Sequence, residues 1–551
     1  MKTINLFKFF ISIFILVIIQ FTNSYSQLSG NYTIGGGGNY STITLAVNAL
    51  TTQGVSSPVT FNLKSGNYNE KVVIDSIPGA SVANYVIIKS QTGVAENVNW
   101  YSSDLSSEFT LKINSGDFIT IQNISFTNMN NSVADRSRIY ITGYIENLKI
   151  MNNNFYGIIN KDNGLISRNA VNKNLVISNN VFNTKFGINF KEIYARSLNT
   201  KIIDNTFNCN RGVEINYHDN LLIEKNNIRC SSIQNSESPS PSGIRVAGCN
   251  GDLKVQKNKL NCLGIEGAVD GIVVGYYSGT NALVANNFIS LKTGTGIWVD
   301  ASTNIHIYFN TVKTGSHSSG DITFVGCSSV YSRNNIMVNL GNFGSASLTY
   351  FLINTTFTTS DFNIFFYNNP YILYGTNIGY VQNLSQFRAL TGLDMHSIEI
   401  PVYFVSDTNL YLSGSSLSDP RLRGTPVSMV SDDIDGNQRN SLYPTMGADE
   451  DELTGILNSA TSNTYSFSLS QNYPNPFNPS TQIIYEIPVK GFISLNVFDI
   501  SGKDILSLVN ENQEAGTYSV TFKAENLSSG TYFYKLTFGD FTETKKMFLI
   551  K

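Results

Sequence analysis

The chain of 551 residues is poor in charge, in cysteine and in long apolar runs. Charged side chains make up only 14% of it and the net charge is −3, so it offers no basic surface for nucleic acid or an anionic membrane. Beyond the N-terminus, no segment is apolar enough to span a bilayer, which takes about 20 residues. The five cysteines show no spacing typical of a metal site. We therefore expect a soluble chain without a nucleic-acid partner.

The first 26 residues have the pattern of an export signal. Lys2 and Lys8 accompany the apolar stretch Phe9–Ile19, and Ser24 and Ser26 supply small residues where a signal peptidase cuts. The stretch is too short to cross a bilayer, which needs about 20 residues. We predict that residues 1–26 are a signal peptide for export across the inner membrane.

The most informative feature present is a short phrase that recurs ten times, in which an apolar anchor closes each copy. The anchors are Phe126, Phe155, Phe182, Phe207, Ile228, Leu260, Ile289, Val312, Ile336 and Phe365. From the second copy on, the residue two positions earlier is always Asn, namely Asn153, Asn180, Asn205, Asn226, Asn258, Asn287, Asn310, Asn334 and Asn363. A period of about 20–30 residues built from strand-like pieces indicates a solenoid, in which each repeat buries its apolar side against its neighbours.

Two further strands are predicted in each repeat. A Gly-led strand with alternating apolar residues follows the anchor, as in Gly243-Ile-Arg-Val, and Asp321 begins the same pattern in place of Gly. A third strand, such as Asn220-Leu-Leu-Ile, leads back to the Asn. Three strands per coil predict an all-β chain with a parallel β-helix, and parallel crossovers are expected to be right-handed.

The Asn column is interpreted as structural. Asn tolerates the left-handed backbone that a tight corner needs. Stacked in successive coils, each amide can donate to one neighbour and accept from the other, as in other Asn ladders.

Three cysteines follow the repeat as well. Cys209, Cys230 and Cys262 each lie two residues after an anchor, on one side of three consecutive coils. Stacked coils place Cα atoms about 4.8 Å apart, which a disulfide tolerates. We favour a column of small buried side chains over a bridge. Cys249 and Cys327 lie three coils apart and are not expected to pair.

With these features, the chain resembles the right-handed parallel β-helix superfamily that includes pectate lyases, pectin esterases and polygalacturonases. Tyr40–Leu50 is similar to the amphipathic helix that caps such solenoids, and Val59–Ile74 to a first coil. The stretch between Asp433 and Glu450, at the far end, resembles the closing segment of secreted bacterial members. The resemblance implies a β-helix over residues 27–452 with a cap at about 28–58.

The C-terminal part is a separate module. A linker is predicted at 453–465, before the proline-rich opening Tyr473-Pro-Asn-Pro-Phe-Asn-Pro-Ser-Thr481. Short alternating strands divided by turn signals then favour a small antiparallel β-sandwich. That opening, Ser528–Tyr534 and Lys546–Lys551 resemble the type A sorting domain of the type IX secretion system, over residues 466–551.

This second resemblance implies a route and partners. After inner-membrane export, the chain would cross the outer membrane through the type IX translocon. A sorting peptidase would remove the module near the linker. The mature protein would then be secreted or held at the outer cell surface, and we expect a monomer.

The candidate ligand site lies on the outward side of the Gly-led strands. Alternation places Asn189, Glu214, Arg245, Val273, Trp298 and Thr323 in one column, with Asp300 two residues beyond Trp298. A Trp ring beside charged side chains is typical of a sugar subsite, so Trp298, Arg245, Glu214 and Asp300 are candidate ligand-binding residues. Longer loops at 229–242, 261–270 and 313–320 would wall this face. For Glu214 and Arg245, which are adjacent in the column, a solvated ion pair is the favoured interpretation.

Catalysis would need a pair of carboxyl groups in addition to the residues of this column. Glycoside hydrolysis takes two carboxyls about 5–10 Å apart. Asp270 and Asp321 begin strands two coils apart in nearly the same register and form the candidate catalytic pair, although Asp also makes turns at such positions. No acidic cluster supports calcium, and the catalytic motifs of polygalacturonases and pectin esterases are absent, so we expect no metal or cofactor.

Two functions remain open from the sequence. One is an exported protein that recognises polysaccharide without catalysis, and the other is a divergent polysaccharide lyase or glycoside hydrolase.

Overall fold

The computed structural model describes residues 26–551 apart from fourteen gaps. The gaps are 105–107, 128–135, 159–160, 193–195, 231–240, 265–266, 316–319, 342–349, 369–372, 376–378, 452–467, 488–490, 515 and 539–540. The predicted signal peptide, except for Ser26, and the predicted linker therefore lie outside the described residues. The chain divides into two units, Met1–Asp451 and Glu452–Lys551.

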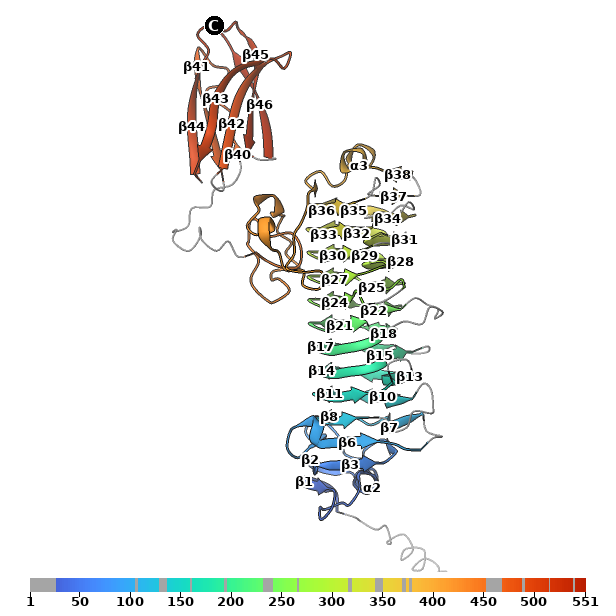
Figure 1. The fold of residues 1–551 in the computed structure, drawn as a ribbon. Helices are drawn as coiled ribbons and strands as arrows, with labels where there is room; N and C mark the ends of the chain where they lie inside the picture. The colour runs from blue at the N-terminus through green and yellow to red at the C-terminus, as the bar shows by residue number, and fades with distance from the viewer. Residues whose placement is uncertain are drawn as a thin grey trace, which may run out of the picture. The chain divides into compact units, whose positions relative to one another are not determined.

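The first unit is a parallel β-helix whose coils stack one above another (Figure 1). One sheet contains the strands that precede each Asn. In order these are β1 (Leu28–Ile34), β2 (Val55–Leu63), β5 (Val86–Ser90), β8 (Ile119–Gln122), β11 (Lys149–Met151), β14 (Val176–Ser178), β17 (Lys201–Ile203), β20 (Leu221–Glu224), β23 (Asp252–Gln256), β26 (Asn281–Ala285), β29 (Thr303–Tyr308), β32 (Ser328–Arg333) and β35 (Phe357–Asp361).

The anchor strands form the second side of each coil. They are β3 (Gly66–Asn69), β6 (Val98–Tyr101), β9 (Ser125–Phe126), β12 (Asn154–Tyr156), β15 (Val181–Lys191), β18 (Thr206–Asn216), β21 (Asn227–Cys230), β24 (Lys259–Cys262), β27 (Phe288–Leu291), β30 (Thr311–Thr314), β33 (Ile336–Asn339), β36 (Ile364–Tyr367) and β39 (Ile398–Glu399).

The Gly-led strands form the third side. They are β4 (Val72–Ile74), β7 (Phe109–Asn114), β10 (Ser137–Glu146), β13 (Asn163–Lys173), the second halves of β15 and β18, β22 (Ser242–Ala247), β25 (Asp270–Gly275), β28 (Ile297–Asp300), β31 (Ile322–Val325), β34 (Tyr350–Ile353) and β37 (Leu373–Gly375). Short strands β16 (Ser197–Leu198), β19 (His218–Asp219) and β38 (Gly379–Val381) border them. Because β15 and β18 turn the corner without a break, the second and third sides are hydrogen-bonded as one sheet. The predicted three strands per coil are confirmed.

The interior is built from the residues that the repeat aligns. Phe126, Phe155, Phe182 and Phe207 stack with ring centroids 5.3, 4.7 and 4.8 Å apart and nearly parallel planes. All four rings are fully buried. Each fully buried side chain of this kind contributes about 1.5–3 kcal/mol, which explains why the anchors must be apolar.

The Asn ladder is confirmed, with one correction of register. From Asn153 onward, each Nδ2 donates to the Oδ1 of the next ladder residue at 2.9–3.2 Å. In the ninth coil the ladder residue is Asn335, not Asn334, because Met337 rather than Ile336 pairs with the anchor Val312. Asn363 ends the ladder by donating to Asp394.

The prediction that the ladder Asn itself takes the left-handed backbone conformation is wrong. The left-handed residue is the one before the ladder Asn, as at Asn179 (φ 55°), Lys225 (φ 56°) and Asn334 (φ 58°). The ladder residues themselves are retained for their hydrogen bonds, since each buried amide also donates to a backbone carbonyl, as Asn226 does to Ile202.

The cysteine column is partly bridged. Cys230 and Cys262 form a disulfide with Cα atoms 4.8 Å apart, so the favoured unbridged column was wrong for this pair. Cys209, Cys249 and Cys327 are buried free thiols, as expected for the last two.

The two ends of the solenoid are closed differently. At the N-terminal end, helix α2 (Ile43–Gln53) has Thr42 as N-cap, and the Glu70 carboxylate accepts from its first N–H groups. At the other end, helix α3 (Leu384–Thr391) places Leu384 and Phe387 in the solenoid core. Both helices cover open coil ends, which a solenoid requires.

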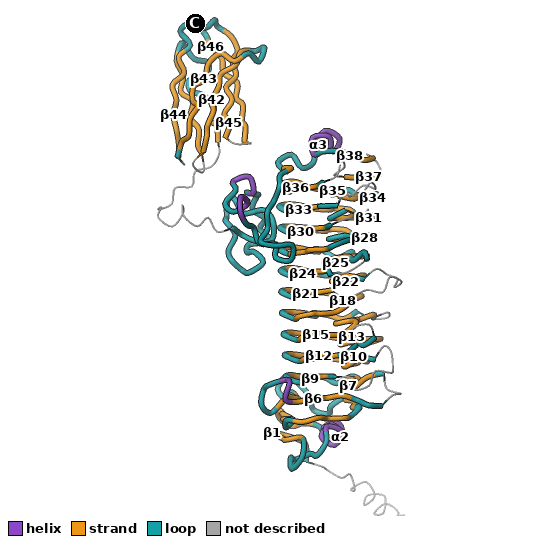
Figure 2. Tube along the Cα trace, in the orientation of Figure 1, coloured by secondary structure: helices purple, strands orange, loops and turns teal. Residues whose placement is uncertain are grey.

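The segment from Asp433 to Glu450 lies elsewhere than predicted. It packs along the side of the solenoid near β27 and β30, within a stretch of loops that contains η2 (Gly414–Ser416) and η3 (Pro420–Leu422) (Figure 2). Another short helix, η1 (Ala95–Asn97), contacts β6 and β9. Arg439 anchors the segment, with its guanidinium 3.9 Å from the Phe309 ring centroid and 3.1 Å from the Glu450 carboxylate.

The second unit is the predicted small antiparallel β-structure. One sheet holds β40 (Ser468–Leu469), β41 (Ser480–Ile487) and β44 (Gly516–Lys523), and the other holds β43 (Asp504–Gln513), β42 (Gly491–Asp499), β45 (Gly530–Phe538) and β46 (Phe541–Leu549). Alternate residues of both sheets share one core, including Tyr485, Leu495 and Tyr534. Among the described residues of the whole chain, no helix has the length and apolarity to cross a membrane.

Candidate functional site

The predicted outward column exists in the predicted register. Asn189, Glu214, Arg245, Val273, Trp298 and Thr323 are successive strand partners on neighbouring coils. Asp300 pairs with Gly275 and Val325, two positions further along. The predicted walls of this face lie largely outside the described residues, in 231–240, 265–266 and 316–319.

Exposure differs along the column. Trp298, Arg245 and Asp300 are partly exposed, whereas Asn189, Glu214 and Thr323 are 5%, 5% and 1% exposed. A partly exposed indole can cover the apolar side of a ligand while the partly exposed Arg245 and Asp300 contact its hydroxyls.

Glu214 is held by cations other than the predicted one. Its carboxylate lies 3.2 Å from the Lys191 Nζ and 3.6 Å from the Arg211 guanidinium. The Arg211 guanidinium also lies over the Phe186 ring at 5.0 Å. The solvated Glu214–Arg245 pair expected from the sequence is therefore replaced by a buried cluster. Lys191 follows the same alternation one coil earlier, so its position was readable from the sequence.

Arg245 contacts Asp270 instead. The guanidinium Nη2 lies 3.5 Å from Asp270 Oδ2, and Asp270 is only 6% exposed. Burial raises the pKa of Asp270 to about 6, against the lowering effect of Arg245. A carboxyl with a pKa near neutrality can exchange a proton under physiological conditions.

Asp321 does not share that surface. It occupies the position of the Gly-led strands at which Gly296 stands in the preceding coil, and a Cβ at Gly296 would lie 2.2 Å from the Val312 side chain in the interior. The Asp321 carboxylate is fully buried and accepts from Thr314. Burial raises its pKa well above the ordinary value. The proposed Asp270–Asp321 pairing is therefore wrong, because Asp270 precedes the Gly position and Asp321 replaces it.

Residues of the column also contain buried polar atoms that have no hydrogen-bond partner among the described residues. These include Asn189 Oδ1, Arg245 Nε and Thr323 Oγ1. Native proteins leave few buried polar atoms unsatisfied, and each costs about 1–3 kcal/mol. Their alignment on one face, around Trp298, distinguishes this face as the candidate site.

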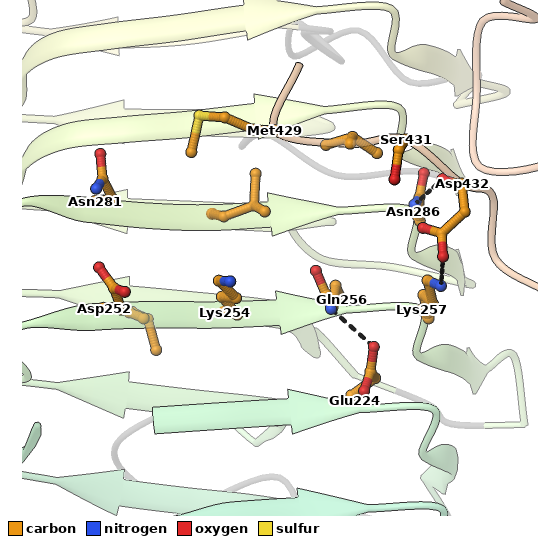
Figure 3. A pocket seen from close by; sticks show the side chains of 13 residues that line it. Glu224, Asp252, Lys254, Gln256, Lys257, Asn281, Asn286, Met429, Ser431 and Asp432 are labelled. Carbon is orange, nitrogen blue, oxygen red and sulfur yellow. Dashed lines mark hydrogen bonds and ion pairs between the residues drawn. The ribbon is translucent and has the colours of Figure 1, made fainter. Parts of the chain in front are cut away.

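A groove on the first sheet is the main alternative. It has a volume of about 330 Å³ between β20, β23, β26 and residues 429–432 (Figure 3). In it, the Lys257 Nζ lies 2.6 Å from Asp432, and Gln256 donates to Glu224 at 2.7 Å. Because these polar groups satisfy one another, we interpret the groove as the seam where the 429–432 segment packs on the solenoid.

A metal centre receives no support from the geometry. In the described ranges, no group of three or more His, Cys, Asp or Glu side chains is arranged to hold a metal ion.

Comparison with known proteins bears first on the C-terminal unit. The family described as "Secretion system C-terminal sorting domain" matches residues 471–551. The chain carries a type IX sorting domain. This domain implies secretion to the cell surface or the extracellular space by the type IX system.

The solved structures that resemble the solenoid include several with low sequence identity. They include DFA-IIIase from Arthrobacter chlorophenolicus A6, with 12% identity over 65% of this chain and 87% of that chain and a TM-score of 0.32. The tailspike protein gp49 of Acinetobacter baumannii bacteriophage Fri1, a capsular polysaccharide depolymerase, shows 12% identity and a TM-score of 0.31. The match covers 97% of this chain and 81% of that chain. The catalytic unit of the GH87 alpha-1,3-glucanase from Streptomyces thermodiastaticus strain HF3-3 shows 13% identity and a TM-score of 0.29. The match covers 65% of this chain and 68% of that chain. No curated protein matches the chain. Likeness at this level carries no information on activity.

Proposed function

We propose that the exported solenoid recognises a polysaccharide along the outward side of β15, β18, β22, β25 and β28, without cleaving it. The observation that supports this most is that the partly exposed Trp298 and Arg245 share one outward column, with the partly exposed Asp300 two residues beyond Trp298. Ligand sites combine such an apolar platform with a few oriented polar groups.

The chemistry of the column suits a chain of sugars. A sugar ring offers an apolar side to the Trp298 indole and hydroxyls that both donate and accept. The partly exposed Arg245 guanidinium can donate to a hydroxyl, and the partly exposed Asp300 carboxylate can accept from one. Successive coils repeat every 4.8 Å or so, so a ligand that contacts all of these residues must be extended along the solenoid axis.

Binding is favoured over hydrolysis because this face lacks a second suitable carboxyl among the described residues. Asp321 is interior. Glu214 lies two coils and three residues away from Asp270, and Asp300 lies one coil and five residues away, which correspond to about 14 Å and about 17 Å. Retaining and inverting glycosidases need separations of about 5–10 Å.

One observation supports a second candidate function. Asp270, with a pKa of about 6, lies beside Arg245, an arrangement that could move a proton during a lyase or hydrolase reaction. If this is the function, Asp270→Asn abolishes activity while binding persists.

The binding proposal is tested with the full chain by affinity electrophoresis in native gels. The gels contain either polygalacturonate, as an acidic polymer, or hydroxyethyl cellulose, as a neutral one. Trp298→Ala should weaken retardation about tenfold, equivalent to about 1.4 kcal/mol. The control Lys254→Ala changes an exposed side chain on the first sheet and should leave retardation unchanged. Equal retardation of the wild type and Trp298→Ala would overturn the proposal.

The same polymers test the second candidate. After incubation with the full chain, reducing ends report hydrolysis and ultraviolet absorbance of unsaturated sugars reports lyase activity. The proposal of binding alone predicts neither product. Release of either product that depends on Asp270 would replace it by the second candidate.

A further inference from the structure

The corner that follows the Gly-led strands carries a second unusual column. We call its members the corner column: Tyr217, Gly248, Tyr276, Ala301 and Gly326, whose φ angles are 58°, 62°, 53°, 43° and 63°. Their N–H groups donate across the coils in sequence, so they stack in register. For example, Tyr276 N–H donates to the Asp300 carbonyl at 2.9 Å.

Tyrosine is an unexpected residue at this corner. The left-handed region is open to Gly and tolerated by Asn, while a bulky side chain there is strained. Gly248 and Gly326 fit this rule, and Tyr217 and Tyr276 break it. Such strain persists where it serves function or where the surroundings stabilise it.

Packing does not account for the two tyrosines. Tyr217 is 41% exposed and Tyr276 is 65% exposed, so both rings leave much of their apolar surface in water. A strained residue that also exposes a large ring gains little from the fold itself. A contact outside the chain would account for two exposed rings at this corner.

The Tyr217 ring is held in a defined position. A Cβ on Gly248 would lie 2.7 Å from the Tyr217 Cε1, and Gly248 is buried although it lies on the corner. The Arg196 guanidinium lies 5.6 Å from the ring centroid and is fixed by Asp219 at 2.8 Å and the Gly248 carbonyl at 2.7 Å. The Tyr217 ring therefore occupies the space that a side chain at position 248 would need.

The corner column adjoins the face that contains Trp298. Tyr276 directly follows Gly275, the strand partner of Asp300, and Asp300 lies two residues beyond Trp298. Tyr217 lies two coils away along the same corner, about 9.6 Å at the usual strand spacing.

We propose that Tyr217 and Tyr276 form a stacking subsite for the same polysaccharide, continuing the Trp298 face around the corner. This inference rests on the proposed function. Aromatic rings cover the apolar sides of sugars, and polar neighbours such as Asp300 and Arg196 accept from or donate to their hydroxyls. The spacing of the two rings fits an oligosaccharide segment rather than a single sugar.

The test uses opposite effects on stability and binding. Tyr276→Asn places a residue that tolerates the left-handed region at the corner, so the thermal midpoint of the full chain should rise. In affinity gels containing polygalacturonate or hydroxyethyl cellulose, the same variant should be retarded at least about threefold more weakly, because a stacking ring is lost. A merely structural tyrosine would not combine higher stability with weaker binding.

Two controls separate the alternatives. Ala301→Gly relieves strain in the same column without removing a ring, so it should raise the midpoint and leave retardation unchanged. Tyr156→Ala removes a ring that is 40% exposed on the anchor strand β12, on another side of the coil, and should also leave retardation unchanged.

The outcomes distinguish this inference from the proposed function. Weaker retardation of both Trp298→Ala and Tyr276→Asn supports both. If Trp298→Ala weakens retardation and Tyr276→Asn does not, the corner subsite is wrong and the proposed function stands. If neither variant differs from the wild type, or the wild type is not retarded, both are overturned.

Discussion

The buried asparagines are the part of the fold whose removal has the most definite expected effect. Asn226 makes five side-chain hydrogen bonds within the interior: two from Asn205 and three to Ile202, Glu224 and Asn258. Asn226→Ala removes the partners of the Asn205 backbone N–H and the Ile202 carbonyl, both buried. At about 1–3 kcal/mol for each unsatisfied group, the expected loss of stability is about 2–6 kcal/mol.

The neighbouring Asn227 supplies a matched control. It is exposed, and Asn227→Ala should change stability by no more than about 0.5 kcal/mol. Urea unfolding of the full chain followed by circular dichroism compares the two variants. Hydrogen exchange measured by mass spectrometry should show faster exchange in peptides from β17 to β23 for Asn226→Ala alone. Equal unfolding midpoints for the two variants would refute the ladder as a source of stability.

Three further changes have definite expected outcomes. Burial raises the pKa of Asp321 in the folded state, so the wild type loses stability as the pH rises above the unfolded pKa near 4. The urea midpoint of Asp321→Asn should therefore be higher than that of the wild type at pH 7. Below pH 4 or so it should not be higher. Replacing both Cys230 and Cys262 by serine opens a link across 32 residues and should cost about 4 kcal/mol in urea unfolding, and a loss below 1 kcal/mol or so would contradict that reasoning. Gly187→Ala places a Cβ 2.3 Å from the Phe207 ring and should lower the thermal midpoint clearly, whereas an unchanged midpoint would mean that the coils can separate without penalty.

The architecture was predictable because each coil repeats the same physical problem. An apolar anchor, a buried amide and a Gly-led strand must align with copies of themselves, so their spacing is visible along the chain. The outward column from Asn189 to Thr323 followed from alternation alone and is confirmed residue by residue.

The errors arose where two alignments satisfied the same pattern. At Asn334 and Asn335 the sequence offers two amides followed by two apolar residues, Ile336 and Met337. Only the backbone decides between them, since Asn334 takes the left-handed conformation and Asn335 accepts from Asn310. Spacing alone contains no such information.

The candidate site was predictable in position and only partly in its contacts. Alternation placed Glu214 beside Arg245. The carboxylate is held instead by Lys191, which reaches across from the neighbouring coil, and by Arg211, three residues earlier in the same strand. Asp321 lies at the corner just before β31, where the alternation of the strand does not apply. At this position a side chain points at the anchor column, since a Cβ at the equivalent Gly296 would lie 2.2 Å from Val312.

The most direct test of polysaccharide recognition is hydroxyl-radical footprinting of the full chain, with and without the polymer that retards it in affinity gels. Mass spectrometry then reads the oxidation of each aromatic residue. Recognition along the proposed face predicts that the polymer protects Trp298, while Tyr473 in the sorting domain, 82% exposed, is oxidised equally in both samples. Equal oxidation of Trp298 with and without bound polymer would contradict the account.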